Sequence, residues 1–209
     1  MPLTQNARLR AHDLLRLRQA PSSDDAPAWL SEAFARAPFA VVRRAEASAG
    51  LIPVGLRGTT RAQRYGTWIE HRTIEAVHSP EALAQTEPAR HRSALAPFAA
   101  LRGLREAACL AEFGWGVTGS AGFELATGVP SVTDSSDLDL LVRTPFALPR
   151  EVAHALHAAL HAHAARTNVR IDVQLETPMG GVALSEWAAN KVRVMVRSTC
   201  GPRLVADPW

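Results

Sequence analysis

The second half of the chain alternates between strand-like and helix-like segments, and this alternation restricts the fold more than any other feature of the sequence. Strand-like apolar runs lie at residues 115–120, 137–143, 169–176 and 191–198. Helix-like spacing of apolar residues lies before and between these runs, at 95–113, 121–128, 149–166 and 184–190, and a further helix-like segment at 29–37 belongs to the first part of the chain. Strands that alternate with helices indicate a sheet covered by helices. We therefore predict an α/β (α+β) domain with a mixed sheet over residues 89–209.

The first part of the chain has shorter apolar runs. Those at residues 39–45 and 51–58 are interrupted by glycines and prolines, which is typical of strands joined by tight turns. Residues 65–78 fit a strand or a helix, and residues 1–20 read as a short basic segment. We expect residues 1–88 to form a smaller, strand-rich α+β domain.

The composition is that of a folded protein. Hydrophobic residues make up 47% of the chain and charged residues 21%, which is far from the low hydrophobicity and high charge of disordered chains. Cys109 and Cys200 are too few and too differently placed for a disulfide framework, so a reducing compartment fits. No segment approaches the roughly 18 apolar residues of a membrane span, and the N-terminus has no apolar signal core. We expect a soluble, cytoplasmic protein with no membrane partner.

The basic residues are almost all arginines, since Lys191 is the single lysine. The arginine side chain is a planar fork that binds phosphate through two hydrogen bonds, so clustered arginines suit a phosphorylated ligand or an acidic partner. Arg57, Arg61 and Arg64 form such a cluster and are candidates for phosphate binding, with Lys191 as a further candidate. A solvated basic loop explains the same cluster equally well.

One motif presents two carboxylates together. Side chains of a strand alternate between its faces, so Asp137 and Asp139 would lie on one face, roughly 7 Å apart, while Leu138 points into the core. Carboxylates at this spacing repel each other, and a divalent cation between them relieves the repulsion. Mg²⁺ prefers a few carboxylates together with phosphate oxygens of a substrate. Asp137 and Asp139 are therefore predicted to be metal ligands and catalytic residues.

A third carboxylate, Asp172, lies on a later strand pattern and faces away from its apolar neighbours. If this strand neighbours the one with Asp137 and Asp139, three carboxylates converge. Such a group can hold two metal ions for an in-line phosphoryl displacement. The alternatives are three solvent-facing aspartates without a ligand, or a site in which Asp134 competes as a ligand.

A glycine-serine turn precedes the paired aspartates. Gly119 and Ser120 stand where a strand is expected to end and a helix to begin. Backbone N–H groups and the positive end of the helix dipole favour phosphate there, and a glycine lets the ligand approach closely. We therefore predict that Gly119 and Ser120 bind phosphate.

The turn, the paired aspartates and the lone aspartate together resemble the nucleotidyltransferase superfamily, whose catalytic domain has a polymerase-β-like fold. The resemblance implies a metal and catalytic role for Asp172 and a phosphate-binding role for Gly119 and Ser120. One departure is the interval AGFELATGVPSVTDS between the turn and the paired aspartates, which is longer than this superfamily commonly shows.

Longer stretches resemble a narrower family, the phosphoribosyl-dephospho-coenzyme A transferases (MdcG). They are spread along nearly the whole length of the chain and read AHDLL, IPVGLRGTTRAQRYGTW, GSAGFELATG, SDLDLLVR, VRIDVQLE and GPRLVADPW. The resemblance implies an enzyme that moves the 5-phosphoribosyl-dephospho-coenzyme A group from triphosphoribosyl-dephospho-coenzyme A to a serine of the apo acyl carrier subunit of malonate decarboxylase, releasing pyrophosphate. It implies Mg²⁺ or Mn²⁺ at Asp137 and Asp139, with Asp172 as a possible base. Residues 1–88 would then recognise the substrate or the carrier.

Two other functions stay open. Nucleotide transfer to another small molecule or to RNA would use the same aspartates. A non-catalytic arginine-rich module would bind nucleic acid or a partner without a metal; the paired aspartates argue against this, so nucleic acid is not an expected ligand. His154, His157 and His161 share one helix face, but no cysteine or carboxylate accompanies them, and we interpret them as part of an amphipathic helix.

Overall fold

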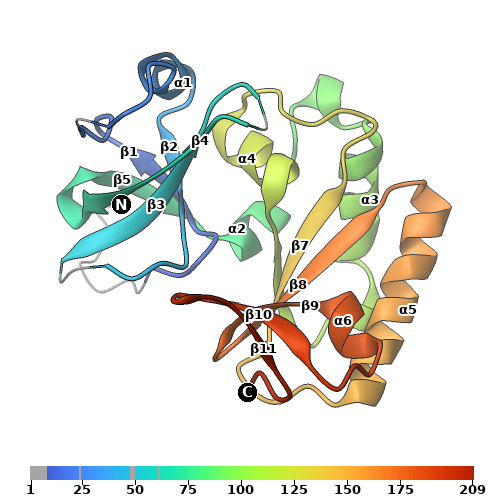
Figure 1. The fold of residues 1–209 in the computed structure, drawn as a ribbon. Coiled ribbons are helices and arrows are strands. Elements are labelled where there is room, and N and C mark those ends of the chain that lie inside the picture. Colours follow the sequence, from blue (N-terminus) through green and yellow to red (C-terminus); the bar gives the residue numbers. More distant parts are fainter. Residues whose placement is uncertain (1–8, 24, 48–49, 61) are drawn as a thin grey trace. The chain divides into compact units, whose positions relative to one another are not determined.

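A computed structural model of the chain describes residues 9–23, 25–47, 50–60 and 62–209. The chain divides into two compact units, Met1–Ser79 and Pro80–Trp209 (Figure 1). Within the described ranges, no helix combines the length and the apolar character that a membrane crossing needs.

Over its described residues, the first unit is a five-stranded antiparallel sheet with one α-helix. The strands follow the spatial order β4-β3-β2-β1-β5. The elements are β1 (Leu14–Leu17), α1 (Leu30–Arg36), β2 (Phe39–Val42), β3 (Leu51–Arg57), β4 (Arg64–Glu70), the 3₁₀ turn η1 (His71–Thr73) and β5 (Ile74–His78). The expected strand-rich character is confirmed, and the ambiguous residues 65–78 form two strands.

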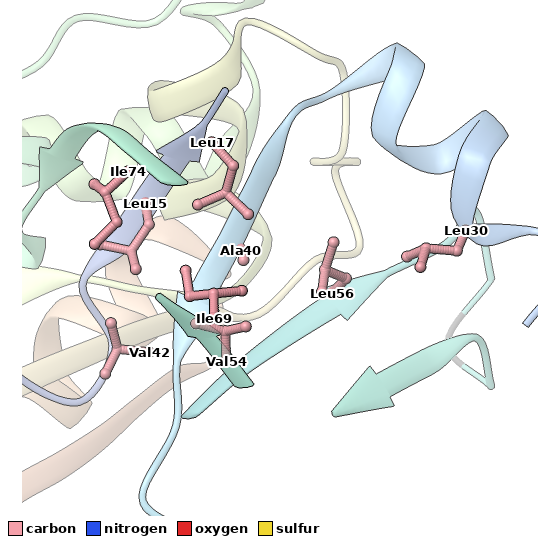
Figure 2. Packing of buried hydrophobic residues seen from close by; sticks show 9 residues of the cluster. All are labelled: Leu15, Leu17, Leu30, Ala40, Val42, Val54, Leu56, Ile69 and Ile74. Atoms are coloured by element: carbon pink, nitrogen blue, oxygen red, sulfur yellow. The ribbon is translucent and has the colours of Figure 1, made fainter. Parts of the chain in front are cut away.

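The core of the first unit follows from the alternation of side chains along its strands. Val54 and Leu56 of β3 and Ile69 of β4 are buried, while the residues between them are more exposed. Figure 2 shows these side chains gathered with those of the other strands and of α1; the cluster consists of Leu15, Leu17, Leu30, Ala40, Val42, Val54, Leu56, Ile69 and Ile74. The short basic segment predicted for residues 1–20 is therefore wrong at β1, because Leu15 and Leu17 bury this strand between β2 and β5.

The second unit is a six-stranded sheet with helices. The strands follow the order β11-β10-β9-β8-β7-β6, in which β7 and β8 are parallel and every other pair is antiparallel. The strands are β6 (Gly114–Val117), β7 (Leu138–Arg143), β8 (Ile171–Thr177), β9 (Gly180–Ala183), β10 (Val194–Ser198) and β11 (Gly201–Val205). The helices are α2 (Pro80–Ala84), η2 (Arg90–Arg92), α3 (Ala96–Arg105), η3 (Ala108–Leu110), α4 (Gly119–Thr127), α5 (Arg150–Thr167) and α6 (Leu184–Ala188). The predicted mixed sheet with helices is confirmed.

Strand β7 lies between β6 and β8 in the sheet and is buried on both faces. Leu140, Leu141 and Val142 are all at most 1% exposed, so neighbours cover both faces of the strand. Figure 1 shows α4 on one side of β7 and α3 and α5 on the other. The parallel pairing of β7 with β8 requires a crossover connection, and α5 supplies it. This arrangement brings the first residues of β7 and β8 to the same end of the sheet.

Several boundaries differ from the sequence-based expectation. The helix expected over 95–113 ends at Arg105, whose guanidinium binds the backbone oxygens of Ala84 and Thr86 as the chain turns toward β6. The strands β9 and β11 were not predicted, because each begins at a glycine and carries no long apolar run; pairing with neighbours makes them strands. The expected domain boundary, between residues 88 and 89, would assign α2 to the first domain. In the structure α2 belongs to the second unit, where it packs on β6 and α4.

Candidate active site

The candidate site lies where β7 and β8 begin. Asp139 and Asp172 are register partners in the parallel pair, so their Cα atoms lie opposite each other on neighbouring strands. Neighbouring strands are about 4.8 Å apart, and residues in register point to the same face of a sheet. The structure therefore places two of the three predicted carboxylates side by side.

Asp137 stands one residue before the start of β7 and is half-buried. It is therefore not held in the strand ladder as Asp139 and Asp172 are. Across the described ranges, no group of three or more His, Cys, Asp or Glu side chains is close enough together to hold a metal ion. Mg²⁺ is usually held by one or two carboxylates, with substrate phosphates and water completing its shell. The pair Asp139 and Asp172, with Asp137 beside it in sequence, fits that donor set.

The glycine-serine turn packs against Asp139. Gly119 has φ +62°, and a Cβ at this position would overlap Oδ2 of Asp139. The backbone N–H of Thr118 donates to the backbone oxygen of Asp139 at 2.9 Å and fastens the turn to the strand. Only glycine satisfies both the backbone angle and the close approach. The first turn of α4, with Gly119 and Ser120, therefore lies beside a predicted metal ligand, where its N–H groups and dipole favour phosphate.

Arg170 is a neighbour of the site that the sequence motifs did not single out. Its Nε and Nη2 lie 3.1 Å and 3.0 Å from the two carboxylate oxygens of Asp172. Both side chains are well exposed, at 71% and 41%, so the ion pair contributes about 0–1 kcal/mol of stability. The spacing Arg-x-Asp on a strand, which puts both side chains on one face, is the signal that points to it.

Asp134 has a structural role. Its Oδ1 accepts a hydrogen bond from the backbone N–H of Ala96 at 3.3 Å, at the first residue of α3. Helix N-termini carry N–H groups without partners in the helix, and acidic side chains stabilise them. This contact with the start of α3 does not favour the expectation that Asp134 competes as a metal ligand.

Arg57 and Arg64 belong to the first unit. They are register partners in the last pair of the β3–β4 hairpin, and both are exposed. Two pairs further along the hairpin, Gly55 faces Gly66, and the side chain of Arg43 lies over both glycines, where a Cβ would meet it. Arg61 lies outside the described residues. Arg43 therefore extends the predicted arginine cluster, and the signal for it is a pair of facing glycines.

Lys191 lies away from the aspartates. Its backbone oxygen accepts a hydrogen bond from Nη2 of Arg150, the first residue of α5. Asp172 instead follows the last turn of α5, and the 18 residues of this helix span about 27 Å. The structure therefore does not bring Lys191 to the site.

The histidines of α5 take different positions. His154 and His161 are exposed, and the rings of His157 and His161 are 6.4 Å apart. His163, which the sequence pattern did not distinguish, is the buried one, and its Nε2 is 3.0 Å from the backbone oxygen of Ala100. These contacts agree with an amphipathic helix packed on α3.

Comparisons with known proteins place the chain in a family. Residues 10–80 match the phosphoribosyl-dephospho-CoA transferase MdcG N-terminal domain, and residues 82–208 match the C-terminal domain of the same family. The chain therefore belongs to the MdcG family of phosphoribosyl-dephospho-CoA transferases.

Relatives of this name match the chain over nearly its full length. The protein of Pseudomonas aeruginosa is 44% identical over 95% of this chain and 92% of its own. A Pseudomonas putida protein is 45% identical over 96% and 95%, and that of Azotobacter vinelandii is 42% identical over 95% and 93%. No solved structure matches the chain.

Proposed function

We propose that the chain transfers the 5-phosphoribosyl-dephospho-coenzyme A group from triphosphoribosyl-dephospho-coenzyme A to a serine of the apo acyl carrier subunit of malonate decarboxylase. The serine oxygen forms a bond to the phosphorus nearest the ribose, the bond from that phosphorus to pyrophosphate breaks, and the hydroxyl proton passes to a base. The observation that carries this proposal is the register of Asp139 and Asp172 beside the Gly119 turn. The name shared by the relatives supports the nature of the transferred group.

The second unit is proposed to be a polymerase-β-like nucleotidyltransferase domain. Three observations support this: a strand that ends in a glycine-serine turn, a helix that starts there, and aspartates on the next two strands. Residues 128–137 lengthen the connection between α4 and β7 beyond the interval common in that superfamily.

Asp139 and Asp172, with Asp137 beside them, would hold Mg²⁺ or Mn²⁺. A divalent cation bound there neutralises charge on the triphosphate and lowers the pKa of a hydroxyl that it contacts. The chain's own contribution is to position the phosphates, because the first turn of α4 lies beside Asp139 and its N–H groups favour an anion there. Asp172 is a candidate to accept the serine proton.

The exposed face of β3 and β4 is proposed to bind the phosphates of the coenzyme A moiety or an acidic surface of the carrier. Arg57 and Arg64 face each other at one end of this hairpin, and Arg43 lies across the facing glycines. Trp68 follows on the same face with 48% of its surface exposed, which suits stacking with an adenine ring.

The decisive experiment follows the mass of the carrier. The protein is incubated with Mg²⁺, triphosphoribosyl-dephospho-coenzyme A and the apo carrier, and the mass of the carrier is measured by mass spectrometry. We expect a gain equal to the phosphoribosyl-dephospho-coenzyme A group, which disappears in Asp139→Asn and on chelation. Glu151→Gln, a matched change of an exposed carboxylate in the first turn of α5, should label as the wild type does. Labelling that persists both in Asp139→Asn and with chelator would overturn the mechanism.

A further inference from the structure

Glu124 is a buried carboxylate that the chemistry above does not use. It lies on α4, one turn after Ser120, with only 6% of its side chain exposed. Its Oε2 accepts hydrogen bonds from the backbone N–H groups of Ser131 and Val132 at 2.6 Å and 2.8 Å. Both residues belong to the connection 128–137 between α4 and β7, so α4 binds this connection through Glu124.

Arg92 completes the arrangement from the other side. Its Nε lies 2.8 Å from Oε1 of Glu124 and its Nη2 lies 3.0 Å from Oε2. The same Nη2 donates to the backbone oxygen of Val132 at 2.6 Å. Both backbone polar groups of Val132 are thus bound by this ion pair, and the residue is 3% exposed. A buried charge is tolerated when it is paired and hydrogen-bonded in this way.

The fastened segment leads directly to Asp137. Figure 1 shows the connection running from α4 past α3 to β7. After Val132, the side chain of Asp134 accepts the hydrogen bond at the start of α3. The chain then turns, and the N–H of Ser136 donates to the backbone oxygen of Thr133 at 3.0 Å. Asp137 is the next residue. Asp139 and Asp172 are placed by the strand ladder, whereas the position of Asp137 depends on this connection.

We propose that the Glu124–Arg92 ion pair positions Asp137 for metal binding by tying residues 131–134 to α4 and η2. Helix α4 is the common support, because its first turn packs on Asp139 through Gly119 and its second turn carries Glu124. The pair is a positioning device and contacts neither substrate nor metal. This role rests on the proposed function, because it assumes that Asp137 contributes to the Mg²⁺ site.

The test uses Glu124→Gln, which keeps the shape of the side chain and removes its charge. We expect hydrogen exchange of residues 129–137 to rise and the half-saturating Mg²⁺ concentration for transfer to increase by about 10–100-fold, as for other residues that orient metal ligands. Saturating Mg²⁺ should restore most of the rate. Glu87→Gln is the matched control, because Glu87 forms an ion pair with Arg105 at the surface of the same unit and should change neither quantity.

The outcomes of these measurements decide the proposal. A lower melting temperature with unchanged Mg²⁺ dependence and unchanged exchange in 129–137 would reduce the ion pair to a structural contact and overturn the inference. If Glu124→Gln does not fold, Arg92→Lys keeps the charge, loses the two-point contact and should show the same shift in Mg²⁺ dependence to a smaller degree. An inactive wild type would count against the proposed function instead, and hydrogen exchange together with calorimetry of Mg²⁺ alone would still test the positioning of Asp137.

Discussion

At the scale of single residues, backbone freedom and buried charge determine what the site can be. Gly119 allows the turn to approach Asp139, and Glu124 holds the segment that leads to Asp137. Neither residue needs to react with a substrate to matter. Gly119 packs against Asp139, which is predicted to bind the metal. Glu124 binds the segment that precedes Asp137, another predicted metal ligand.

Gly119→Ala should abolish transfer while the protein stays folded. The new Cβ would meet Oδ2 of Asp139 and would also strain a backbone with φ +62°, so we expect a loss of about 1–3 kcal/mol in the free energy of unfolding and at least about 100-fold in kcat. Gly201→Ala is the control, because Gly201 also has a positive φ, +105°, but a Cβ added there would meet no atom within 4 Å. Urea unfolding and the carrier-labelling rate measure the two effects. Equal rates for both variants would contradict the role given to Gly119.

Glu124 should make stability depend on pH in the acid range. Burial raises the pKa of its carboxyl, but the hydrogen bonds from Arg92, Ser131 and Val132 outweigh this, and the pKa in the folded protein lies below its ordinary value. The unfolded chain then binds the proton more readily. The stabilisation is present above the unfolded pKa of about 4.3 and is lost as the pH falls through the lower folded pKa.

The measurement is thermal unfolding between pH 3 and 6. Between the two pKa values, the wild type should lose stability more steeply than Glu124→Gln as the pH falls. The charged group that acts on this carboxyl is Arg92, which is hydrogen-bonded to it, and Asp134 in turn acts electrostatically on Arg92. Parallel pH profiles for the two proteins would show that Glu124 titrates alike in the folded and unfolded chain.

At the scale of elements, the end of the chain is fastened to the second unit by two tryptophans. The rings of Trp187 and Trp209 meet edge to face with centroids 5.0 Å apart. Nε1 of Trp209 donates to the backbone oxygen of Thr144 at 2.6 Å, and Nε1 of Trp187 donates to that of Leu148 at 2.9 Å. The residues after β11 therefore stabilise the connection between β7 and α5.

Trp209→Ala should lower the free energy of unfolding by about 1–3 kcal/mol, the sum of a lost aromatic pair and a lost hydrogen bond. Phe146→Ala is the comparison, because this aromatic residue is 84% exposed in the same connection and should change stability by less than about 0.5 kcal/mol. Urea titration followed by circular dichroism distinguishes them. Equal destabilisation by both changes would contradict the packing of the terminal tryptophan.

At the scale of the whole molecule, the two units divide the proposed work. The aspartates and the glycine turn belong to the second unit, while the arginine face of β3 and β4 belongs to the first. Long-range attraction by arginines accelerates the encounter with an acidic partner and weakens with salt. Chemistry and recognition should therefore respond to different substitutions.

The double variant Arg57→Ala, Arg64→Ala should raise KM for the precursor or the carrier by about 5–50-fold with little change in kcat, the expected pattern when binding that is equal in ground and transition states is removed. It should also reduce the salt dependence of kcat/KM. Arg36→Ala, an exposed arginine at the end of α1, is the control and should leave KM unchanged. A fall in kcat with KM intact would instead place the arginines at the reacting phosphate.

Elements with a clear local pattern of apolar residues could be predicted from the sequence. Elements that form only by hydrogen bonding to a neighbouring strand could not. The alternation of apolar residues located β7, β8 and α5, and it placed Asp139 on a strand beside buried leucines. It did not reveal β1, β9 or β11, because four- or five-residue strands without a long apolar run become strands only through hydrogen bonds to neighbours.

By itself, the amino-acid sequence determined that strand-borne aspartates follow a glycine-serine turn, since side-chain alternation and glycine's backbone freedom are local properties. Only the tertiary structure decided that Asp139 and Asp172 face each other, that Asp134 caps α3 and that Lys191 lies far away. It also assigned partners to Glu124, which in sequence is one acidic residue in an apolar helix. The physical reason is that strand register and the pairing of buried charges depend on contacts between residues remote in sequence, which no local pattern encodes.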